Sequence, residues 1–298
     1  LLANSIGSSP VLLVSAILVI SGIGFKISVV PFHSWAPDTY EGAPLPITAY
    51  LSVSSKATGF VALIVLLTKV FESSGQSWGV ILAIVAGATM TLGNLVALQQ
   101  TNPVRLLAYS SISQAGFIIA PLAVSGITGN YQDGIFASVT YLIIYAFMNI
   151  GAFLSVHLFT NFTKSDNFYE WGGIAKHSPL TGVLTTVFFF SLAGIPPLGG
   201  WFAKFVVFRS LLSTGEIIGV SLAIVGAINA VIALVYYARI SKVIWMDELK
   251  NPEEEKSFEF QSPLKVVGAL TVLITFVAGI FPGIFSYLGE VSSIFFGN

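Results

Sequence analysis

The chain has 298 residues, of which 55% are hydrophobic and only 9% are charged. Soluble domains carry about 25% charged residues, so this composition excludes a water-soluble globular fold and indicates an all-α polytopic membrane protein. The formal net charge of −1 argues against nucleic acid as a partner. Because the chain has no cysteine, disulfides and cysteine-ligated zinc or iron–sulfur sites are excluded, and three scattered histidines indicate no haem or metal cluster.

The first residues, LLANSIGSSP, include neither an initiator methionine nor a basic region, so we expect no signal peptide. A membrane helix needs about 20 mostly apolar residues, and eight stretches of the chain meet that requirement. In chain order the predicted spans are Pro10–Val30, Ile47–Leu67, Trp78–Leu98, Val104–Ser125, Gly134–Phe159, Pro179–Leu212, Ile217–Ile244 and Pro263–Leu288. The sixth span is too long for one straight pass and is interrupted at GIPPLGG.

Basic residues are unevenly divided between the two sides of this arrangement. Eight fall in the connections that follow the odd-numbered spans: Arg105, Lys164, Lys176, Arg239, Lys242, Lys250, Lys256 and Lys265. The other side has only Lys69 and Arg209. The positive-inside rule therefore places the eight on the cytoplasmic or equivalent side, and both termini on the opposite side. The long charged run MDELKNPEEEKSFEFQSP is expected to be a solvated loop, with a docking surface as the alternative.

Three lysines lie within the predicted spans, in GIGFKISVV (Lys26), SVSSKATGF (Lys56) and GGWFAKFVVF (Lys204). A lysine at the centre of a membrane helix costs about 2.5–3.5 kcal/mol. Lysines near a helix end can instead reach the headgroups, and this reading stays open for Lys204. Lys56 is too deep in its span for that. A desolvated amine can gain and lose a proton near neutral pH, which is the property that a proton relay needs.

The fourteen acidic residues all fall in predicted loops or at span ends, so no span centre offers a carboxylate partner for these lysines. The partner comes from elsewhere, or the lysines are linked through water and nearby polar residues. The stretch YSSISQ, residues 109–114, is a candidate for that link. The isolated Asn94, Asn149 and Asn229 are expected to join helices to one another.

Prolines break two of the spans. Pro31 and Pro37 interrupt the end of the first, and the Pro196–Pro197 pair, flanked by glycines, interrupts the sixth. Free backbone groups at membrane depth persist only where protein or water satisfies them, so each break is expected to line a polar cavity. A lysine lies within eight residues of each break, before the first and after the second. Paired interrupted helices are typical of transporters with internal repeats, and the reversed order suggests an inverted repeat.

Three motifs carry a resemblance to a known family: GFKISVVPFHSWAPDTYEGAPLPITAYLSVSSK, RLLAYSSISQAGF and LAGIPPLGGWFAKF. Together they resemble subunit N of bacterial NADH–quinone oxidoreductase, or respiratory complex I, an antiporter-like membrane subunit related to mitochondrial subunit 2 and to subunit 2 of the photosynthetic NDH complex. The resemblance covers essentially all of residues 1–298. It implies a single antiporter-like transmembrane domain with an inverted-repeat fold, in which the eight spans correspond to the seventh to fourteenth helices of a fourteen-helix subunit.

The resemblance also implies roles for single residues. Lys26, Lys56 and Lys204 match the family's lysines in a hydrated chain of ionisable groups at the membrane midplane. The family's glutamate partner of the first lysine lies on a helix that precedes this chain. His33, just after the first break, could join the relay or act as an interfacial or capping histidine. Asp38 and Glu41 could form a proton entrance or cap the second span.

The function expected from these features is proton translocation by a membrane-arm subunit of NADH–quinone oxidoreductase, coupled to quinone reduction elsewhere in the complex. The partners expected are other membrane-arm subunits, lipid and protons; no cofactor is expected in this chain, and the quinone is not bound here. The location expected is the bacterial inner membrane, or an organellar membrane. Two alternatives stay open: a subunit of a multi-subunit cation/proton antiporter or membrane-bound hydrogenase, and a non-transporting membrane scaffold.

Overall fold

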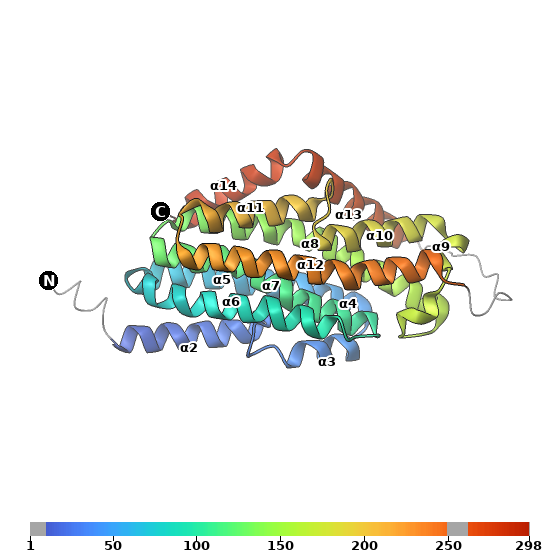
Figure 1. Ribbon diagram of the computed structural model, residues 1–298, viewed down its shortest axis with the longest axis horizontal. Coiled ribbons are helices and arrows are strands. Elements are labelled where there is room, and N and C mark those ends of the chain that lie inside the picture. Colours follow the sequence, from blue (N-terminus) through green and yellow to red (C-terminus); the bar gives the residue numbers. More distant parts are fainter. Residues whose placement is uncertain (1–9, 249–261, 298) are drawn as a thin grey trace.

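The computed structural model describes residues 10–248 and 262–297, and in these ranges every regular element is a helix. The long helices run side by side along the long axis of the molecule (Figure 1). The predicted all-α, polytopic membrane fold is confirmed. The expectations for the first nine residues, for most of the charged loop with Lys250 and Lys256, and for the C-terminal residue Asn298 lie outside the described residues.

The elements follow one another in this order: α2 (Pro10–Ile27), α3 (Trp35–Gly42), α4 (Leu45–Tyr50), the π-helical turn η1 (Leu51–Ser55), α5 (Lys56–Val65), the π-helical turn η2 (Leu66–Val70), the 3-10 turn η3 (Glu72–Ser74), α6 (Gly75–Ala97), α7 (Pro103–Thr128), α8 (Tyr131–Thr163), the 3-10 turn η4 (Phe168–Trp171), α9 (Ile174–His177), α10 (Pro179–Ala193), α11 (Gly199–Ser213), α12 (Ile217–Met246), α13 (Ser262–Ile280) and α14 (Gly283–Gly297). Elements α4 to η2 form one continuous helical run, Leu45–Val70.

Within the described ranges, seven helical stretches are long and apolar enough to cross a membrane. They match the predicted spans one to five, seven and eight, with ends that shift by a few residues. The sixth predicted span is the pair α10 and α11, which the chain interrupts after Ala193 and resumes at Gly199. The two predicted breaks are therefore present, one between α2 and α3 and one between α10 and α11.

The prediction for the last span is wrong at its C-terminal end. It runs from Pro263 to Leu288 without interruption, whereas α13 ends at Ile280 and α14 begins at Gly283. Proline has no backbone N–H and disfavours helix in the residue before it, so Pro282 ends the first helix. The two helices meet at an angle and together traverse the length of the bundle (Figure 1).

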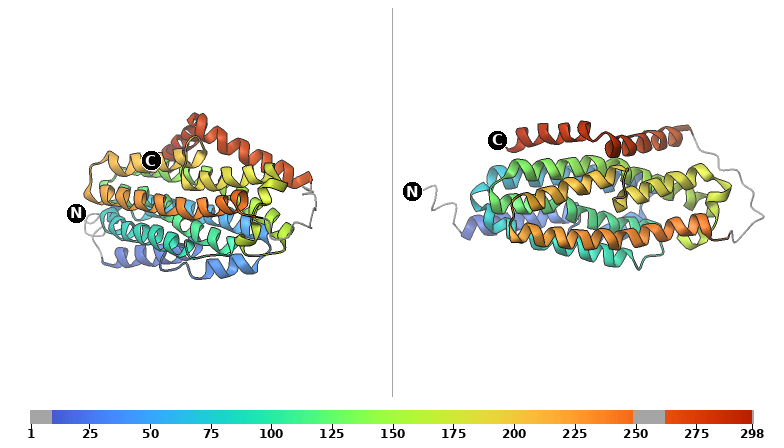
Figure 2. Two further views of the ribbon diagram at one scale, coloured as in Figure 1. Left: turned by 45° about the vertical axis from the view of Figure 1, so that its right-hand side comes forward. Right: turned by 45° about the horizontal axis from the view of Figure 1, so that its top comes forward.

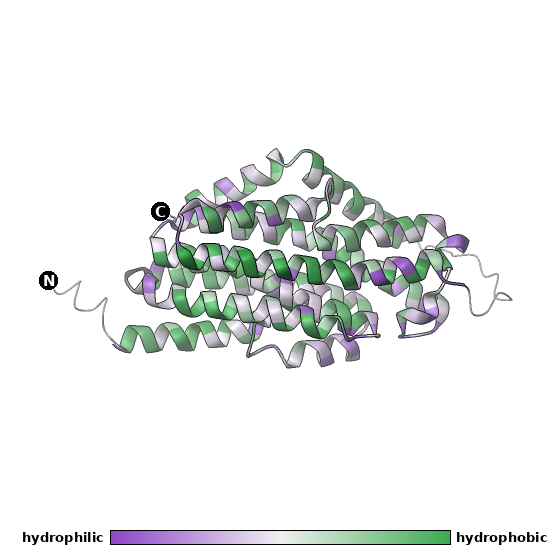
Figure 3. Cartoon of the chain, viewed as in Figure 1, coloured by the Kyte–Doolittle hydropathy of each residue, from purple (hydrophilic) through white to green (hydrophobic). Residues whose placement is uncertain are grey.

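The two ends of the bundle differ in charge. Helix α2 begins and α14 ends at the same end of the molecule, as Figures 1 and 2 show. Lys69 lies toward this end, since its neighbour Thr68 donates to the carbonyl of Phe296 in α14, and so does Arg209, which lies near Ser293 of α14. The remaining described loop-associated basic residues, from Arg105 to Lys265, lie in or next to the connections at the opposite ends of the helices. Hydrophobic residues dominate the helices between these ends (Figure 3). The two groups of loop charges therefore lie at opposite ends, and which end faces the cytoplasm stays a prediction.

Helix α7 forms the centre of the bundle. Of its most apolar 18-residue window, 94% is buried within the chain, against 33% for α12 and 28% for α13. It contacts α3, α6, α8, α11 and α12. Its approach to α6 is close, since a Cβ added at Gly93 would lie 2.6 Å from the backbone nitrogen of Ser113. Small residues permit such approaches between membrane helices, and they bring the polar stretch of α7 into the middle of the fold.

Candidate functional site

Lys56 is buried at the first position of α5, directly after the π-helical turn η1. Its side chain is only 1% exposed, and its Nζ donates to Ser111 Oγ at 2.6 Å and to Ser111 O at 3.3 Å. The ring of Tyr40 lies with its centroid 5.9 Å from the same nitrogen. All of these groups are formally neutral. π-helical turns inside α-helices are frequent at functional sites, and this one places the amine against the polar face of α7.

Several buried polar atoms surround Lys56 and lack a well-formed hydrogen bond among the described residues. The hydroxyl groups of Tyr40 and Tyr145 are buried close to Ser111, but neither forms a hydrogen bond of good geometry with a described residue. The Oδ1 atom of Asn149 is also unpartnered in that part of the chain, although its Nδ2 donates to Ser52 Oγ at 2.8 Å. Buried polar groups in proteins are normally paired with protein atoms or ordered water.

Lys204 is also buried, on α11 just beyond the second break. Its side chain is 5% exposed, and its Nζ donates to the carbonyl of Ala193 at 2.6 Å and lies 5.1 Å from the centroid of the Phe117 ring. Ala193 is the last residue of α10. The last carbonyls of a helix lack helical partners and carry partial negative charge, so the broken helix supplies the acceptor for the amine. The alternative of a lysine that reaches the headgroups is wrong for Lys204.

Polar side chains on and around α7 lie between the two amines, in separate hydrogen-bonded groups. Next to Ser111, Ser110 makes a short hydrogen bond with the hydroxyl of Tyr237, which also lies close to Gln114. Gln114 Nε2 donates to the carbonyl of Leu192 at 3.1 Å, next to the carbonyl that accepts from Lys204. The hydroxyl of Tyr141 makes a short hydrogen bond to Gln114 Oε1. Three members of the predicted YSSISQ stretch therefore lie between the lysines.

The tyrosines of these groups were missed in the sequence, because aromatic residues in a membrane span read as apolar. The asparagines behave mostly as expected. Asn94 on α6 donates through Nδ2 to Asn229 Oδ1 on α12 at 3.0 Å, which joins the two helices. Asn94 Oδ1 also accepts from the hydroxyl of Tyr236, at 2.9 Å, so this contact supports the residue next to Tyr237.

Lys26 is not brought together with the other two lysines. It lies on α2, and its side chain is exposed in the described part of the chain, with its stem against the backbone of Gly59 on α5. That Lys26 faces inward stays a prediction. The break beside it is closed by other groups, since Val30 N donates to Thr89 Oγ1 at 3.0 Å and Trp35 Nε1 donates to Phe25 O at 2.8 Å.

His33 lies in the break between α2 and α3 and is partly buried. Its Nδ1 atom is buried and has no hydrogen-bond partner among residues 10–248 and 262–297. Its carbonyl accepts from Ala36 N at 3.0 Å, which starts α3. Both a relay role and a capping role for this residue are compatible with that position.

Asp38 and Glu41 lie on α3 and form ion pairs with Arg105 at the start of α7, at 2.8 and 2.5 Å. Neither caps the helix that begins at Leu45, whose N-cap position makes no side-chain hydrogen bond. The sequence analysis did not predict that Arg105 pairs with these two acids.

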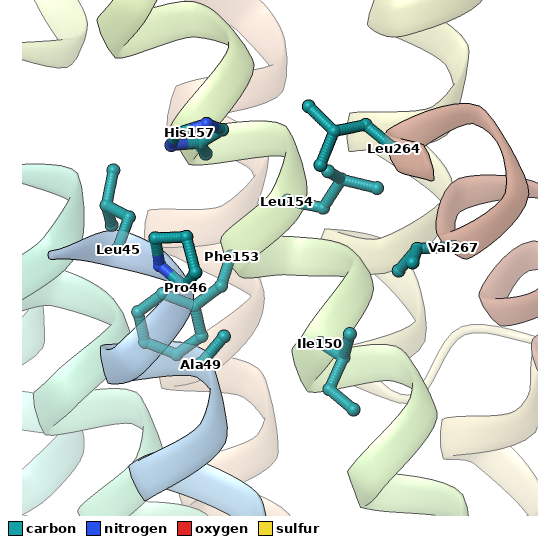
Figure 4. Close-up of a pocket in the computed structure, with 9 residues that line it drawn as sticks. All are labelled: Leu45, Pro46, Ala49, Ile150, Phe153, Leu154, His157, Leu264 and Val267. Atoms are coloured by element: carbon teal, nitrogen blue, oxygen red, sulfur yellow. The ribbon is translucent and has the colours of Figure 1, made fainter. Parts of the chain in front are cut away.

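An apolar pocket lies apart from these polar groups. It has a volume of about 200 Å³ and lies between α4, α8 and α13, with Pro46, Phe153 and Val267 among its lining residues (Figure 4). His157 lies at its edge and contacts the side-chain amide of Asn161. Binding sites for polar ligands need several convergent polar groups, which this pocket lacks. Among the described residues there is also no cluster of histidine and acidic side chains that could hold a metal.

Comparison with known proteins gives the family. Residues 2–232 match the model of the transmembrane family described as NADH:quinone oxidoreductase/Mrp antiporter. The chain is 37% identical over 277 residues to NADH-quinone oxidoreductase subunit N of Desulforamulus reducens, covering 93% of this chain and 56% of that protein. It is 40% identical over 286 residues to NAD(P)H-quinone oxidoreductase subunit 2 of Synechocystis, covering 93% and 53%. The chain thus spans about half the length of the curated relatives it matches.

Solved structures agree with this assignment. A chain of respiratory complex I from Thermus thermophilus has a TM-score of 0.75 and 27% identity over 94% of this chain and 60% of its own length. A chain of the Mrp complex from Dietzia has a TM-score of 0.82 at 21% identity, covering 94% and 58%, which shows the shared fold alone. The buried lysines therefore lie in a protein that belongs to the NADH:quinone oxidoreductase/Mrp antiporter family of membrane subunits.

Proposed function

We propose that this chain translocates protons as part of a membrane-arm subunit of NADH–quinone oxidoreductase. The relay that we assign consists of Lys56 and Lys204, with Lys26 and His33 at the first break. The partners are other membrane-arm subunits and lipid, in a bacterial inner membrane or an organellar membrane. The quinone and the redox cofactors belong to other subunits, and this chain supplies no redox centre.

The single observation that carries the proposal is the environment of the two buried amines. Each is buried and donates only to neutral oxygen atoms, and polar side chains of α7 lie between them. A buried charge without a counter-charge is costly, so a small electrostatic or conformational change in a neighbouring subunit can shift a proton on or off. A purely structural lysine would instead be expected to form a buried ion pair.

The steps that these residues can perform follow from the geometry. Lys56 Nζ donates a proton in its hydrogen bond to Ser111 Oγ. The hydroxyl groups of Ser110 and Tyr237 can each accept one proton and donate another, as proton transfer requires. Gln114 cannot take up a proton at neutral pH, so transfer past it toward Lys204 needs water beside the amide. The carbonyl of Ala193 then stabilises the charged form of Lys204 at the end of α10.

An antiporter subunit is the second candidate, because the Mrp structure shares the fold. Relatives at 37–40% identity are named as subunits of quinone oxidoreductases, which favours the first candidate. In a non-transporting scaffold the lysines would only hold helices together.

The first prediction tests the relay directly. Lys56→Met keeps the approximate volume and removes the charge, and in the complete complex we expect assembly to persist while protons pumped per electron pair fall. Lys69→Met is the matched control, because Lys69 is exposed near the end of the same helical run. A scaffold would show reduced stability with an unchanged ratio, and that result would rule out the relay role of Lys56.

A further inference from the structure

Three charged side chains join α3 to the start of α7 outside the proposed relay. Arg105 Nη1 donates to Asp38 Oδ1 at 2.8 Å and to Glu41 Oε2 at 2.5 Å. The second oxygen of Glu41 accepts from Asn102 Nδ2 at 3.0 Å. Asn102 in turn caps α7, since its Oδ1 accepts from the backbone nitrogens of Val104 and Arg105. We call Arg105, Asp38 and Glu41 the ion triad.

The two helices that the ion triad joins form two walls of the Lys56 site. Tyr40, between the two acids on α3, places its ring 5.9 Å from Lys56 Nζ. Ser111 on α7 accepts the hydrogen bond from that nitrogen. Ser111 is six positions after Arg105, which is about 9 Å along a helix. A shift at the start of α7 is therefore carried to Ser111 by a rigid element.

Helix α3 is also held by contacts away from the ion triad, such as the hydrogen bond from Trp35 Nε1 to Phe25 O. It has only eight residues, and the hydroxyl of Thr48 donates to the carbonyl of Tyr40 at 2.9 Å, which ties α3 to the run that carries Lys56. The acids are solvent-accessible, with side chains 76% and 43% exposed, and Arg105 is 28% exposed. Ion pairs with this exposure add little to the free energy of folding. What distinguishes the ion triad is its position between the two helices that carry Tyr40 and Ser111.

We propose that Arg105 is a positioning residue, which holds Tyr40 and Ser111 at the Lys56 amine through its ion pairs with Asp38 and Glu41. The effect on proton transfer rests on the proposed function of Lys56, whereas the effect on geometry does not. This role differs from that of a proton entrance at Asp38 and Glu41, in which the acids would act by exchanging protons themselves.

The second prediction concerns Arg105→Gln in the complete complex. We expect the rate of proton translocation to fall roughly two- to thirty-fold, the range seen for residues that modulate coupling between sites. Arg105→Lys should recover part of the rate. The double exchange Glu41→Arg with Arg105→Glu should recover more than either single change, because it restores one ion pair between the same helices. Failure of the exchange to improve on its single variants would overturn the proposal.

Two further measurements separate this proposal from the proposed function. In a cryo-EM structure of the Arg105→Gln complex, we expect the Lys56 Nζ to Ser111 Oγ distance to exceed hydrogen-bonding range; an unchanged distance overturns the positioning role whether or not Lys56 carries protons. In a Lys56→Met background, Arg105→Gln should cause no additional loss of translocation. An equal loss in both backgrounds would show that the acids act on a separate route, as an entrance would.

Discussion

The two broken helices share a sequence pattern and differ in structure. At the second break, the carbonyl that ends α10 accepts directly from Lys204, and the amine is buried. At the first break, Thr89 and Trp35 satisfy backbone groups, and Lys26 is exposed in the described part of the chain. Among the described residues, the second break is thus satisfied by its own lysine and the first by Thr89 and Trp35. What matters is whether the amine or a neighbouring side chain satisfies the freed backbone.

The third prediction concerns the second break and has the largest effect on folding. Gly194 has a φ of +97°, and a Cβ there would lie 2.8 Å from Lys204 Cδ. Gly194→Ala should cost about 1–3 kcal/mol in backbone strain and should displace the amine from Ala193. We expect a lower temperature at which the subunit leaves the solubilised complex, together with slower proton translocation.

Gly215→Ala is the matched control for that substitution. Gly215 also has a positive φ, +69°, but a Cβ there would meet nothing within 4 Å. It should reproduce the loss of stability without the loss of translocation. If both variants slow translocation equally, the contact with Lys204 has no part in the effect. That result would contradict the role of Lys204 at the second break.

The fourth prediction concerns the first break and is smaller. Thr89→Val removes the acceptor of Val30 N, which is partly buried, and should cost about 0.5–1.5 kcal/mol. Thr58→Val is the control, because Thr58 donates only to Ser54 O within its own helical run and is exposed. Thermal release of the subunit from the complex is the measurement. Equal stability of the two variants would contradict the role of Thr89 in closing the break.

The sequence predicts the elements of this fold better than their interruptions. Apolar stretches locate the helices to within a few residues, and the GIPPLGG motif locates the break between α10 and α11. The angle between α13 and α14 was missed although Pro282 lies between Gly279 and Gly283, a similar signal. The π-helical turn before Lys56 has no signal that we recognise in the local sequence.

The candidate site was predictable only in part, because the sequence shows charge and polarity but not how side chains pack. A charge in an apolar span is conspicuous, so Lys56 and Lys204 stand out, and YSSISQ stands out as a polar stretch. Tyr141 and Tyr237 do not, because their hydroxyl groups matter only once packing has placed them against Gln114 and Ser110. Exposure of Lys26 and the pairing of Arg105 with acids on α3 depend on how helices distant in sequence pack together.

The central claim is that Lys56 and Lys204 act in series on one proton path. It is tested most directly by counting protons moved per electron pair in complete complexes that carry Lys56→Met, Lys204→Met or both. Two groups in series should give the same decrease in each single variant and no further decrease in the double variant. A double variant that loses the sum of the two single losses, or single variants with an unchanged ratio, would contradict the account.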